Sequence, residues 1–338
     1  MLLVLVEHAA GKPHDVSLQA LTLARSFDAE AQIAALLVGG EGRAAADQLA
    51  AHGVSTTYVA DLGETSMFAP DAWAAALEGL ADRLGAMAVF AAGTERGNEV
   101  MARAAARMSL PLASNCVSIA KGQPVVLTRQ RWGGSLLEEA RLNSERPLVT
   151  AAPHAIPIET AMASTPVQVE SFTPRLDAKD LLVHVVEHLD APGGGVSLAD
   201  AKVVVSGGRG VGSKEGFAII EELAGLLGGA VGCSRVVTSA GWRPHTDQVG
   251  QTGTKIAPEL YIACGISGAT QHMAGCKGAK RILAINSDAE APIMLNSDYA
   301  VVGDLKEIVP AISRQIRAVK AMPVNAPLPS PLPEGERE

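Results

Sequence analysis

The chain lacks the signals of several protein classes. It has no run of Lys or Arg, and its 28 basic and 36 acidic residues give a formal charge of -8, so a nucleic-acid-binding face has no electrostatic support. No stretch approaches the roughly 18 consecutive apolar residues of a membrane-spanning helix. The opening MLLVLVEH reaches Glu7 without the basic region or cleavage site of a signal peptide. We therefore expect a soluble, cytoplasmic protein.

Cysteine pairs and catalytic signatures are also missing. No CxxC pair suggests zinc or a redox dithiol, so the cysteines are expected to be reduced thiols that act as small buried apolar residues. HExxH and GxSxG do not occur, and no Cys/His pair lies in a recognisable local motif. The sequence therefore nominates no catalytic residue and no metal ligand. The cysteines in question are Cys116, Cys233, Cys264 and Cys276.

An alternation of short β-type runs and Ala-rich segments fills residues 1–152. It predicts helices over 16–27, 42–51, 70–83 and 97–108, a pattern typical of a parallel sheet with helices on both faces. The runs VVLTRQRW, SLLEEARLN and PLVTAAP stand too close together for intervening helices. They predict an antiparallel or mixed extension of the sheet.

A second α/β alternation follows a predicted linker at residues 190–200, where Pro192 to Gly195 are all turn formers. KVVVSGG, LYIACG, RILAIN and YAVVGD are predicted strands, with helices at about 214–228, 268–276 and 305–320. We predict two doubly wound α/β domains with mainly parallel sheets, at 1–189 and 201–322. The Pro-rich residues 323–338 form an expected flexible tail.

The stretch SGGRGVGSKEGF, residues 206–217, has the glycine-rich composition of a phosphate-binding turn. It nevertheless matches neither of the two well-known phosphate-binding motifs, GxGxxG and the P-loop. GxGxxG requires a further Gly or Ala where Ser213 and Glu215 stand, and the P-loop requires Gly-Lys-Ser/Thr where Gly212, Ser213 and Lys214 stand. Its glycines would let the backbone turn sharply and approach a ligand, and Arg209 suits a pyrophosphate. A glycine-rich turn without a ligand is the alternative interpretation.

Other notable residues of this half also follow predicted strands, whose carboxyl ends form the ligand-binding edge of an open α/β sheet. DQVGQTGTK is a polar loop with nothing to pack, in which Gln251 and Thr252 could address a heteroaromatic ring. His272 would lie in the first turn of a helix whose N-terminus is aimed at the same crevice; a merely half-exposed histidine is the alternative interpretation. Asp304 is either a helix N-cap or a ribose ligand. Together these features indicate a large dinucleotide.

These residues resemble the α subunit of electron transfer flavoproteins. The likeness is strongest over 202–320, where the family's blocks occur in its order and spacing: VVVSGGRG, GCSRVVTSAGW, QVGQTG, PELYIACGISGATQHMAG, AINSDAEAPI and YAVVGDL. The resemblance implies an N-terminal nucleotide-binding-like α/β domain that is a scaffold for the partner β subunit. It implies that the C-terminal domain is a Rossmann-like (DHS-like) domain that binds FAD.

The resemblance also assigns roles by position. Arg209 would lie beside the FAD pyrophosphate and Arg235 over the isoalloxazine, where it and His272 would favour negative charge near N1 and O2. The Thr252 hydroxyl would lie near N5. The implied FAD contacts are Arg209, Ser234 and Arg235; Val249, Gly250, Gln251 and Thr252 along the ring; Ser267, Gly268, Ala269, Thr270, Gln271 and His272 on the other wall; and Asn286, Asp304 and Leu305 at the adenosine half.

The function that the resemblance implies is that of an electron carrier in a heterodimer with a β subunit. Such a carrier takes electrons from flavin dehydrogenases, such as the acyl-CoA dehydrogenases of fatty acid β-oxidation, and passes them to a quinone oxidoreductase or another acceptor. Three alternatives stay open: a subunit of an electron-bifurcating flavoprotein, an NAD(P)-dependent oxidoreductase, and a module whose first domain binds a mononucleotide. For the last, GTERGNE at 93–99 is the one suggestive turn.

Overall fold

The computed structural model describes residues 1–63, 68–161, 166–187 and 196–321. The chain divides into two compact units, Met1–Asp190 and Ala191–Glu338. Part of the predicted linker and the whole predicted tail lie outside the described residues. Among the described helices, none combines the length and the apolar character needed to cross a bilayer.

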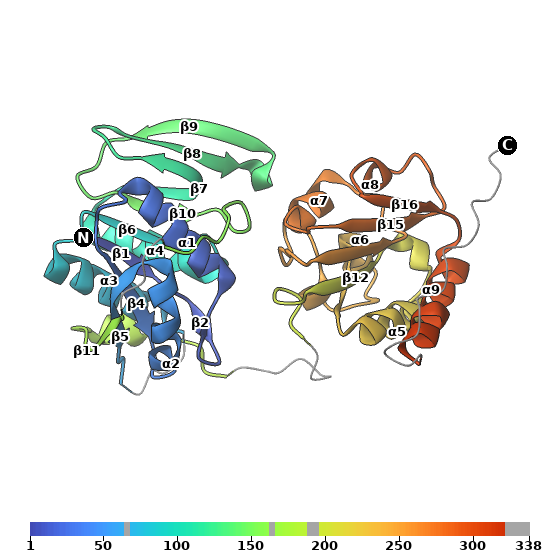
Figure 1. The fold of residues 1–338 in the computed structure, drawn as a ribbon, viewed down its shortest axis with the longest axis horizontal. Helices are drawn as coiled ribbons and strands as arrows, with labels where there is room; N and C mark the ends of the chain where they lie inside the picture. Colours follow the sequence, from blue (N-terminus) through green and yellow to red (C-terminus); the bar gives the residue numbers. More distant parts are fainter. Residues whose placement is uncertain (64–67, 162–165, 188–195, 322–338) are drawn as a thin grey trace. The chain divides into compact units, whose positions relative to one another are not determined.

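The N-terminal unit contains a nine-stranded sheet within its described residues, in the order β11-β5-β4-β1-β6-β10-β7-β8-β9 (Figure 1). All neighbours are parallel except the β7-β8 and β8-β9 pairs, which are antiparallel. The strands are β1 (Leu2–Leu5), β4 (Ile33–Val38), β5 (Val54–Ala60), β6 (Ala88–Ala92), β7 (Leu112–Ala120), β8 (Val125–Arg131), β9 (Leu136–Leu142), β10 (Leu148–Ala151) and β11 (Gln168–Phe172).

Helices cover this sheet because its strands are apolar on both faces. Along β1, Leu3 and Leu5 belong to one core cluster, whereas Leu2 and Val4 belong to the other. Side chains of α3 and α4 enter the first cluster and side chains of α1 enter the second. The remaining elements are α1 (Asp15–Phe27), α2 (Gly42–Ala46), α3 (Pro70–Leu84), α4 (Glu95–Met108) and the small hairpin β2 (His8–Ala9) and β3 (Lys12–Pro13).

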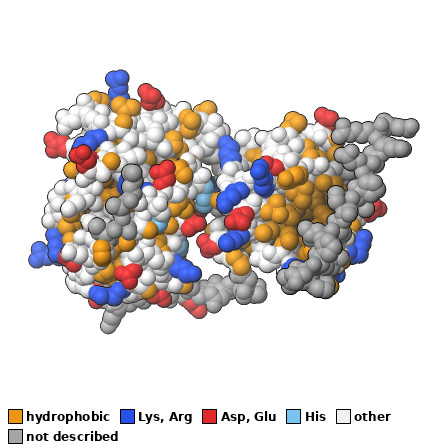
Figure 2. All heavy atoms as spheres, viewed as in Figure 1, with side chains coloured by type: hydrophobic (Ala, Val, Ile, Leu, Met, Phe, Trp, Pro, Cys, Tyr) orange, Lys and Arg blue, Asp and Glu red, His pale blue; other side chains and the backbone are white. Residues whose placement is uncertain are grey.

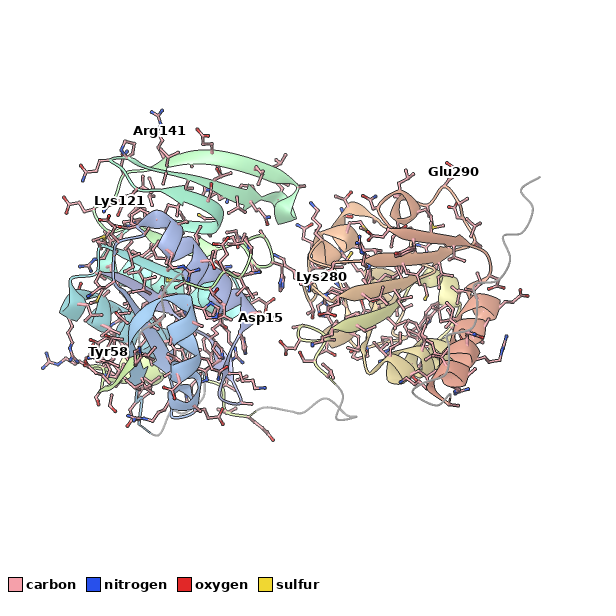
Figure 3. The ribbon with its side chains drawn as sticks, in the orientation of Figure 1. Asp15, Tyr58, Lys121, Arg141, Lys280 and Glu290 are labelled. Carbon is pink, nitrogen blue, oxygen red and sulfur yellow. The ribbon has the colours of Figure 1, made fainter. Side chains whose placement is uncertain are left out.

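The predicted extension is a mixed one. β8 and β9 run antiparallel at one side of the sheet, and Figure 3 shows Arg141 projecting outward from β9. The PLVTAAP run behaves differently, because its strand β10 inserts in parallel between β6 and β7. Strand β11 at the opposite edge was not predicted, because its five residues are mostly polar and exposed and give only a weak apolar signal.

The C-terminal unit has a five-stranded, wholly parallel sheet in the order β13-β12-β14-β15-β16. Helices α5 and α9 cover one face and α7 and α8 the other (Figure 1). The fold prediction of doubly wound α/β architecture is therefore confirmed. The elements are β12 (Val203–Gly207), α5 (Ala218–Leu227), β13 (Ala230–Cys233), α6 (Arg235–Ser239), β14 (Leu260–Cys264), α7 (Thr270–Cys276), β15 (Ile282–Asn286), α8 (Pro292–Leu295), β16 (Tyr299–Val302) and α9 (Leu305–Lys320).

All four cysteines are buried and free, as predicted. Burial raises the pKa of each thiol from 9.0 to about 12, so none is a thiolate near neutral pH. On the visible face of each unit, acidic and basic side chains intermingle rather than gather by sign (Figure 2).

Glu7 is a buried carboxyl group just beyond the end of β1, where the Thr94 hydroxyl donates to its Oε1 at 2.5 Å. Burial raises the pKa of Glu7 above 4.5, against the opposing effects of Thr94, His14 and Arg96. Because the folded state binds this proton more tightly than the unfolded state, the group costs stability as pH rises above 4.5.

Glu7→Gln keeps an acceptor for the Thr94 hydroxyl and removes this cost. We expect a higher unfolding temperature than that of the unmodified chain at pH 7, with the two values converging near pH 4. Thermal unfolding at both pH values measures the effect. A variant that is less stable at pH 7 would show that the charged form of Glu7 stabilises the fold.

Candidate functional site

The predicted site residues of the C-terminal unit lie at one edge of its sheet. All five strands are parallel, so their carboxyl ends meet there. Arg209 follows β12, Ser234 and Arg235 follow β13, the segment from Ser267 follows β14, Asn286 ends β15, and Asp304 follows β16. The loop Val249–Thr252 joins them through the Val249 amide, which donates to the Cys233 carbonyl at 2.9 Å.

Backbone hydrogen bonds tie these loops to one another. The loop after β12 bonds to the loop after β14, this second loop bonds to the end of β15, and the end of β15 bonds to the residue that follows β16. The bonds run from Gly208 N–H to Cys264 O (2.8 Å), Gly210 N–H to Gly265 O (3.1 Å), the Asn286 side-chain amide to Ile266 O (2.9 Å) and Gly303 N–H to Asn286 O (3.0 Å). The structure thus gathers blocks that are up to about 100 residues apart in the sequence into one surface.

The glycines of VVVSGGRG have a packing role that the sequence interpretation did not include. A Cβ added at Gly208 would lie 2.2 Å from the Gly265 carbonyl oxygen, and one at Gly210 would lie 2.8 Å from the Gly265 Cα. Gly265 itself adopts φ +62°. Glycine is therefore required because two loops of the protein touch backbone to backbone, and a close approach to a ligand is not needed to explain it.

Arg209 and Arg235 are both exposed at this edge, and neither guanidinium has a partner among the described residues. Arg235 is the first residue of α6, a place where the helix dipole does not favour a cation. Ser234 is the N-cap of α6, and its side chain makes no capping hydrogen bond. Two unpaired cations and a free hydroxyl are thus available to an anionic ligand.

The loop Val249–Thr252 is packed against α7, contrary to the expectation that it has nothing to pack. Gln248, Val249 and Gly250 are buried. The Gln251 amide donates to the Gln271 carbonyl at 2.7 Å, and a Cβ on Gly275 would lie 2.3 Å from the Gly250 nitrogen. Gln251 and Thr252 remain exposed on this fixed loop.

His272 is buried, with 7% of its surface exposed, which rules out the alternative interpretation of a half-exposed histidine. Its Nε2 lies 2.6 Å from the Tyr261 hydroxyl. Burial lowers the pKa of His272 from 6.5 to about 4, and the nearby Val249 carbonyl opposes this only in part. The imidazole is therefore neutral at physiological pH, and Nδ1 makes no hydrogen bond of ordinary geometry with the described residues.

The three residues predicted for the adenosine half have local roles of their own. Asp304 caps α9, its carboxylate accepting the Lys306 amide at 2.8 Å, so the N-cap interpretation holds. The Asn286 side chain bonds to Ile266 and also accepts the Asp288 amide at 3.1 Å. Leu305 is buried, with its Cδ2 against the Gly265 turn. All three residues still lie at the carboxyl edge of the sheet.

On the wall after β14, Ser267, Ala269, Thr270 and Gln271 are exposed. Gly268 is buried at φ +82°, and a Cβ there would lie 2.4 Å from the Ile293 nitrogen. This segment therefore presents small and polar side chains on a backbone held tightly against α8.

Two contributors to the site were missed by the sequence interpretation. Gln248 is 2% exposed; its amide donates to the Thr252 hydroxyl at 3.0 Å and accepts from the Thr238 hydroxyl at 2.7 Å, joining α6 to the loop. Tyr261, in the middle of an apolar strand pattern, looked like core. Nothing in the local sequence signals that its hydroxyl meets His272.

The turn GTERGNE of the N-terminal unit is explained by packing. The Thr94 hydroxyl accepts the Gly97 amide at 2.8 Å and so caps α4. A Cβ at Gly97 would lie 2.1 Å from the Ala92 carbonyl oxygen. The Thr94 hydroxyl and Gly97 of this turn are thus engaged within the fold.

An open, parallel α/β sheet with glycine-rich turns, unpaired arginines and a buried imidazole at its carboxyl edge defines a nucleotide-cofactor-binding unit. Sequence profiles assign it further: residues 197–277 match the "Electron transfer flavoprotein FAD-binding domain", and residues 2–176 match the "Electron transfer flavoprotein domain". The chain is also similar to curated relatives over nearly its whole length.

It is 38% identical over 321 residues to "Electron transfer flavoprotein subunit alpha" of Mycobacterium leprae, covering 94% of this chain and 98% of the relative. It is 34% identical over 318 residues to the protein of that name from Bacillus subtilis, covering 93% and 97%. A further relative, "Protein FixB" of Clostridium saccharobutylicum, is 35% identical over 321 residues, covering 94% and 96%. The chain belongs to the electron transfer flavoprotein α-subunit family, and its cofactor is FAD.

The described residues fit this cofactor. Arg209 and Arg235 supply unpaired positive charge, the exposed Gln251 and Thr252 supply polar groups on a rigid loop, and His272 has a buried nitrogen without a bonded partner.

Proposed function

We propose that this chain is the α subunit of a heterodimeric electron carrier. It pairs with a β subunit, accepts electrons from flavin dehydrogenases such as acyl-CoA dehydrogenases, and delivers them to a quinone oxidoreductase or a comparable acceptor. In this proposal it has no substrate-turnover site of its own, and its place of work is the cytoplasm. The family assignment supports the proposal, and the observation that carries it is the convergence of the loops with Arg209 and Arg235 at one sheet edge.

FAD, when bound, supplies the redox chemistry; the residues of this chain bind it and set its electrostatics. Arg209, with the linked turns after β12 and β14, would hold the pyrophosphate. Arg235 would stabilise negative charge that develops on the ring system. The wall Ser267–His272 and the loop Val249–Thr252, which touch each other through Gln251 and Gln271, would border the ring and exclude water from one side.

The test is purification of the chain with its β subunit, followed by an absorption spectrum and a stepwise anaerobic reduction. We expect a flavin spectrum that a dehydrogenase with its substrate can bleach. One FAD per heterodimer supports the simple carrier, whereas two would favour the electron-bifurcating alternative. A colourless complex that retains NAD(P) would overturn the proposal.

Arg235→Ala is expected to lower the midpoint potential of the bound FAD, because it removes positive charge that favours the reduced form. For a two-electron couple, each 1.4 kcal/mol of lost stabilisation corresponds to about 30 mV. A spectroscopic reductive titration measures this change. Arg281→Ala is the matched control, since Arg281 precedes β15 at the opposite edge of the same sheet and pairs with Asp298 at 2.7 Å. Equal potentials in the two variants would remove Arg235 from the proposed role.

A further inference from the structure

The hydroxyl of Tyr261 lies in the core of the C-terminal unit. Tyr261 has no exposed surface, and its ring packs among the apolar residues that cover the α7 and α8 face of the sheet. A buried phenol requires a hydrogen-bond partner, and His272 Nε2 lies 2.6 Å from it. The Ser206 hydroxyl also acts on Tyr261, but it makes no hydrogen bond of ordinary geometry with the described residues. β14 and α7 are thus joined by a polar contact inside an apolar layer.

The protonation state of this pair is fixed by its surroundings. Burial raises the pKa of Tyr261 well above 10, so the phenol keeps its proton. The ionisable groups that act on it are Cys276, Cys264 and Cys233, whose thiols are neutral because burial raises each pKa to about 12. For His272, burial and the Val249 carbonyl are the two causes of its shifted pKa, and no charged side chain contributes.

The geometry also selects one tautomer of His272. A neutral imidazole carries one N–H, and the second nitrogen accepts. The Tyr261 hydroxyl keeps its proton and needs an acceptor, and His272 Nε2 is the acceptor within hydrogen-bond distance of it. Nε2 then accepts from the Tyr261 hydroxyl, and Nδ1 carries the hydrogen.

His272 adjoins the loop proposed to lie along FAD, because the Val249 carbonyl is near enough to affect its pKa. Val249 begins that loop and is 1% exposed. Gln251 is bonded to the residue preceding His272, and Gly250 touches Gly275 of the same helix. A rotation of the imidazole would therefore disturb the loop and the wall together.

We propose that Tyr261 is a positioning residue of the FAD site: by donating to Nε2 of His272 it places the imidazole hydrogen on Nδ1, facing the Val249–Thr252 loop. The role in FAD binding rests on the function proposed above, whereas the tautomer does not. The FAD site then offers the isoalloxazine ring a neutral N–H donor in a fixed position, rather than a cation whose charge changes with pH.

The tautomer is measured on the full-length chain without FAD, by long-range nitrogen–proton NMR of histidine labelled with nitrogen-15. His272 is assigned by the signal that disappears in His272→Gln. We expect a protonated Nδ1, an unprotonated Nε2 and no titration between pH 5 and pH 8. An Nε2–H tautomer in the unmodified chain would overturn the proposal without reference to any variant.

Tyr261→Phe removes the donor and is expected to abolish the single Nδ1–H signature. Tyr58→Phe is the control, because Tyr58 is a buried tyrosine of the N-terminal unit (Figure 3). Retention of the same tautomer in Tyr261→Phe would overturn the proposal, because the Val249 carbonyl alone would then suffice.

The second measurement is made on the chain with FAD bound. Tyr261→Phe should shift the visible absorption bands and the midpoint potential of FAD by more than Tyr58→Phe does. A changed tautomer with an unchanged flavin spectrum would overturn the positioning role. If the unmodified chain binds no FAD, the proposed function fails, and the NMR result still decides the tautomer.

Discussion

Gly275→Ala is expected to weaken FAD binding about 10- to 100-fold while the α/β fold persists. The added Cβ would lie 2.3 Å from the Gly250 nitrogen and 2.4 Å from its Cα, and neither backbone can give way without moving α7 or the Val249–Thr252 loop. Overpacking of this kind costs about 1 to 3 kcal/mol, which corresponds to the stated range of affinity. Fluorescence titration of the purified chain with FAD measures the dissociation constant.

Gly225→Ala provides the matched control for this substitution. Gly225 lies within α5 of the same unit, and a Cβ there would meet nothing within 4 Å. Alanine in a helix interior is favoured over glycine by roughly 0.5 to 1 kcal/mol, so this variant should bind FAD normally and be slightly more stable. Normal FAD binding by Gly275→Ala would show that the contact between α7 and the loop does not support the cofactor.

Arg107→Ala is expected to destabilise the N-terminal unit by about 3 kcal/mol. Arg107 on α4 pairs with Glu78 at 2.6 Å and with Asp180 at 2.7 Å, and the Asp180 side chain is 2% exposed. Removing one partner of a buried ion pair leaves the other charge buried without compensation, which typically costs about 3 to 5 kcal/mol. Because Arg107 is partly exposed, we expect a loss at the lower end of this range. Urea unfolding monitored by circular dichroism measures the loss.

The pH dependence gives this prediction a second readout. Burial alone would raise the pKa of Asp180, but the Asp177 amide and Arg107 outweigh it, so the pKa lies below 3.8. The stabilisation is therefore present above pH 3.8 and is lost as pH falls through the lower folded value. Without Arg107, acid unfolding should begin at a higher pH.

Two controls separate the buried charge from general effects. Lys179→Ala removes an exposed pair with Asp177 in the same turn, 3.5 Å long, and should cost less than about 1 kcal/mol. Adding Asp180→Asn to Arg107→Ala removes the stranded charge and should recover part of the stability. If the double variant is no more stable than Arg107→Ala alone, the loss comes from packing of the Arg107 side chain.

The sequence by itself determined the class of fold and the cofactor. Local periodicity predicts most helices and strands of both units, because continuous apolar runs that alternate with helical segments have few other ways to be buried. Linked blocks such as VVVSGGRG and QVGQTG identify the family. Segments with weak local signals, such as β11 and the short edge strand β13, escape this reasoning, since their pairing depends on a neighbour supplied by the rest of the sheet.

Tertiary structure decided how the site residues are used. Only folding brings Gly208 against Gly265, so only the structure shows that the glycines serve contact between loops. β10 inserts between β6 and β7 because a partner edge exists there, a fact with no local signature. The sequence leaves open whether His272 faces a ligand or is merely half-exposed, and only the structure shows that β14 places the Tyr261 hydroxyl beside it in the core. Long-range contacts set burial and hydrogen-bond partners, and these determine protonation and tautomer, which residue order alone does not specify.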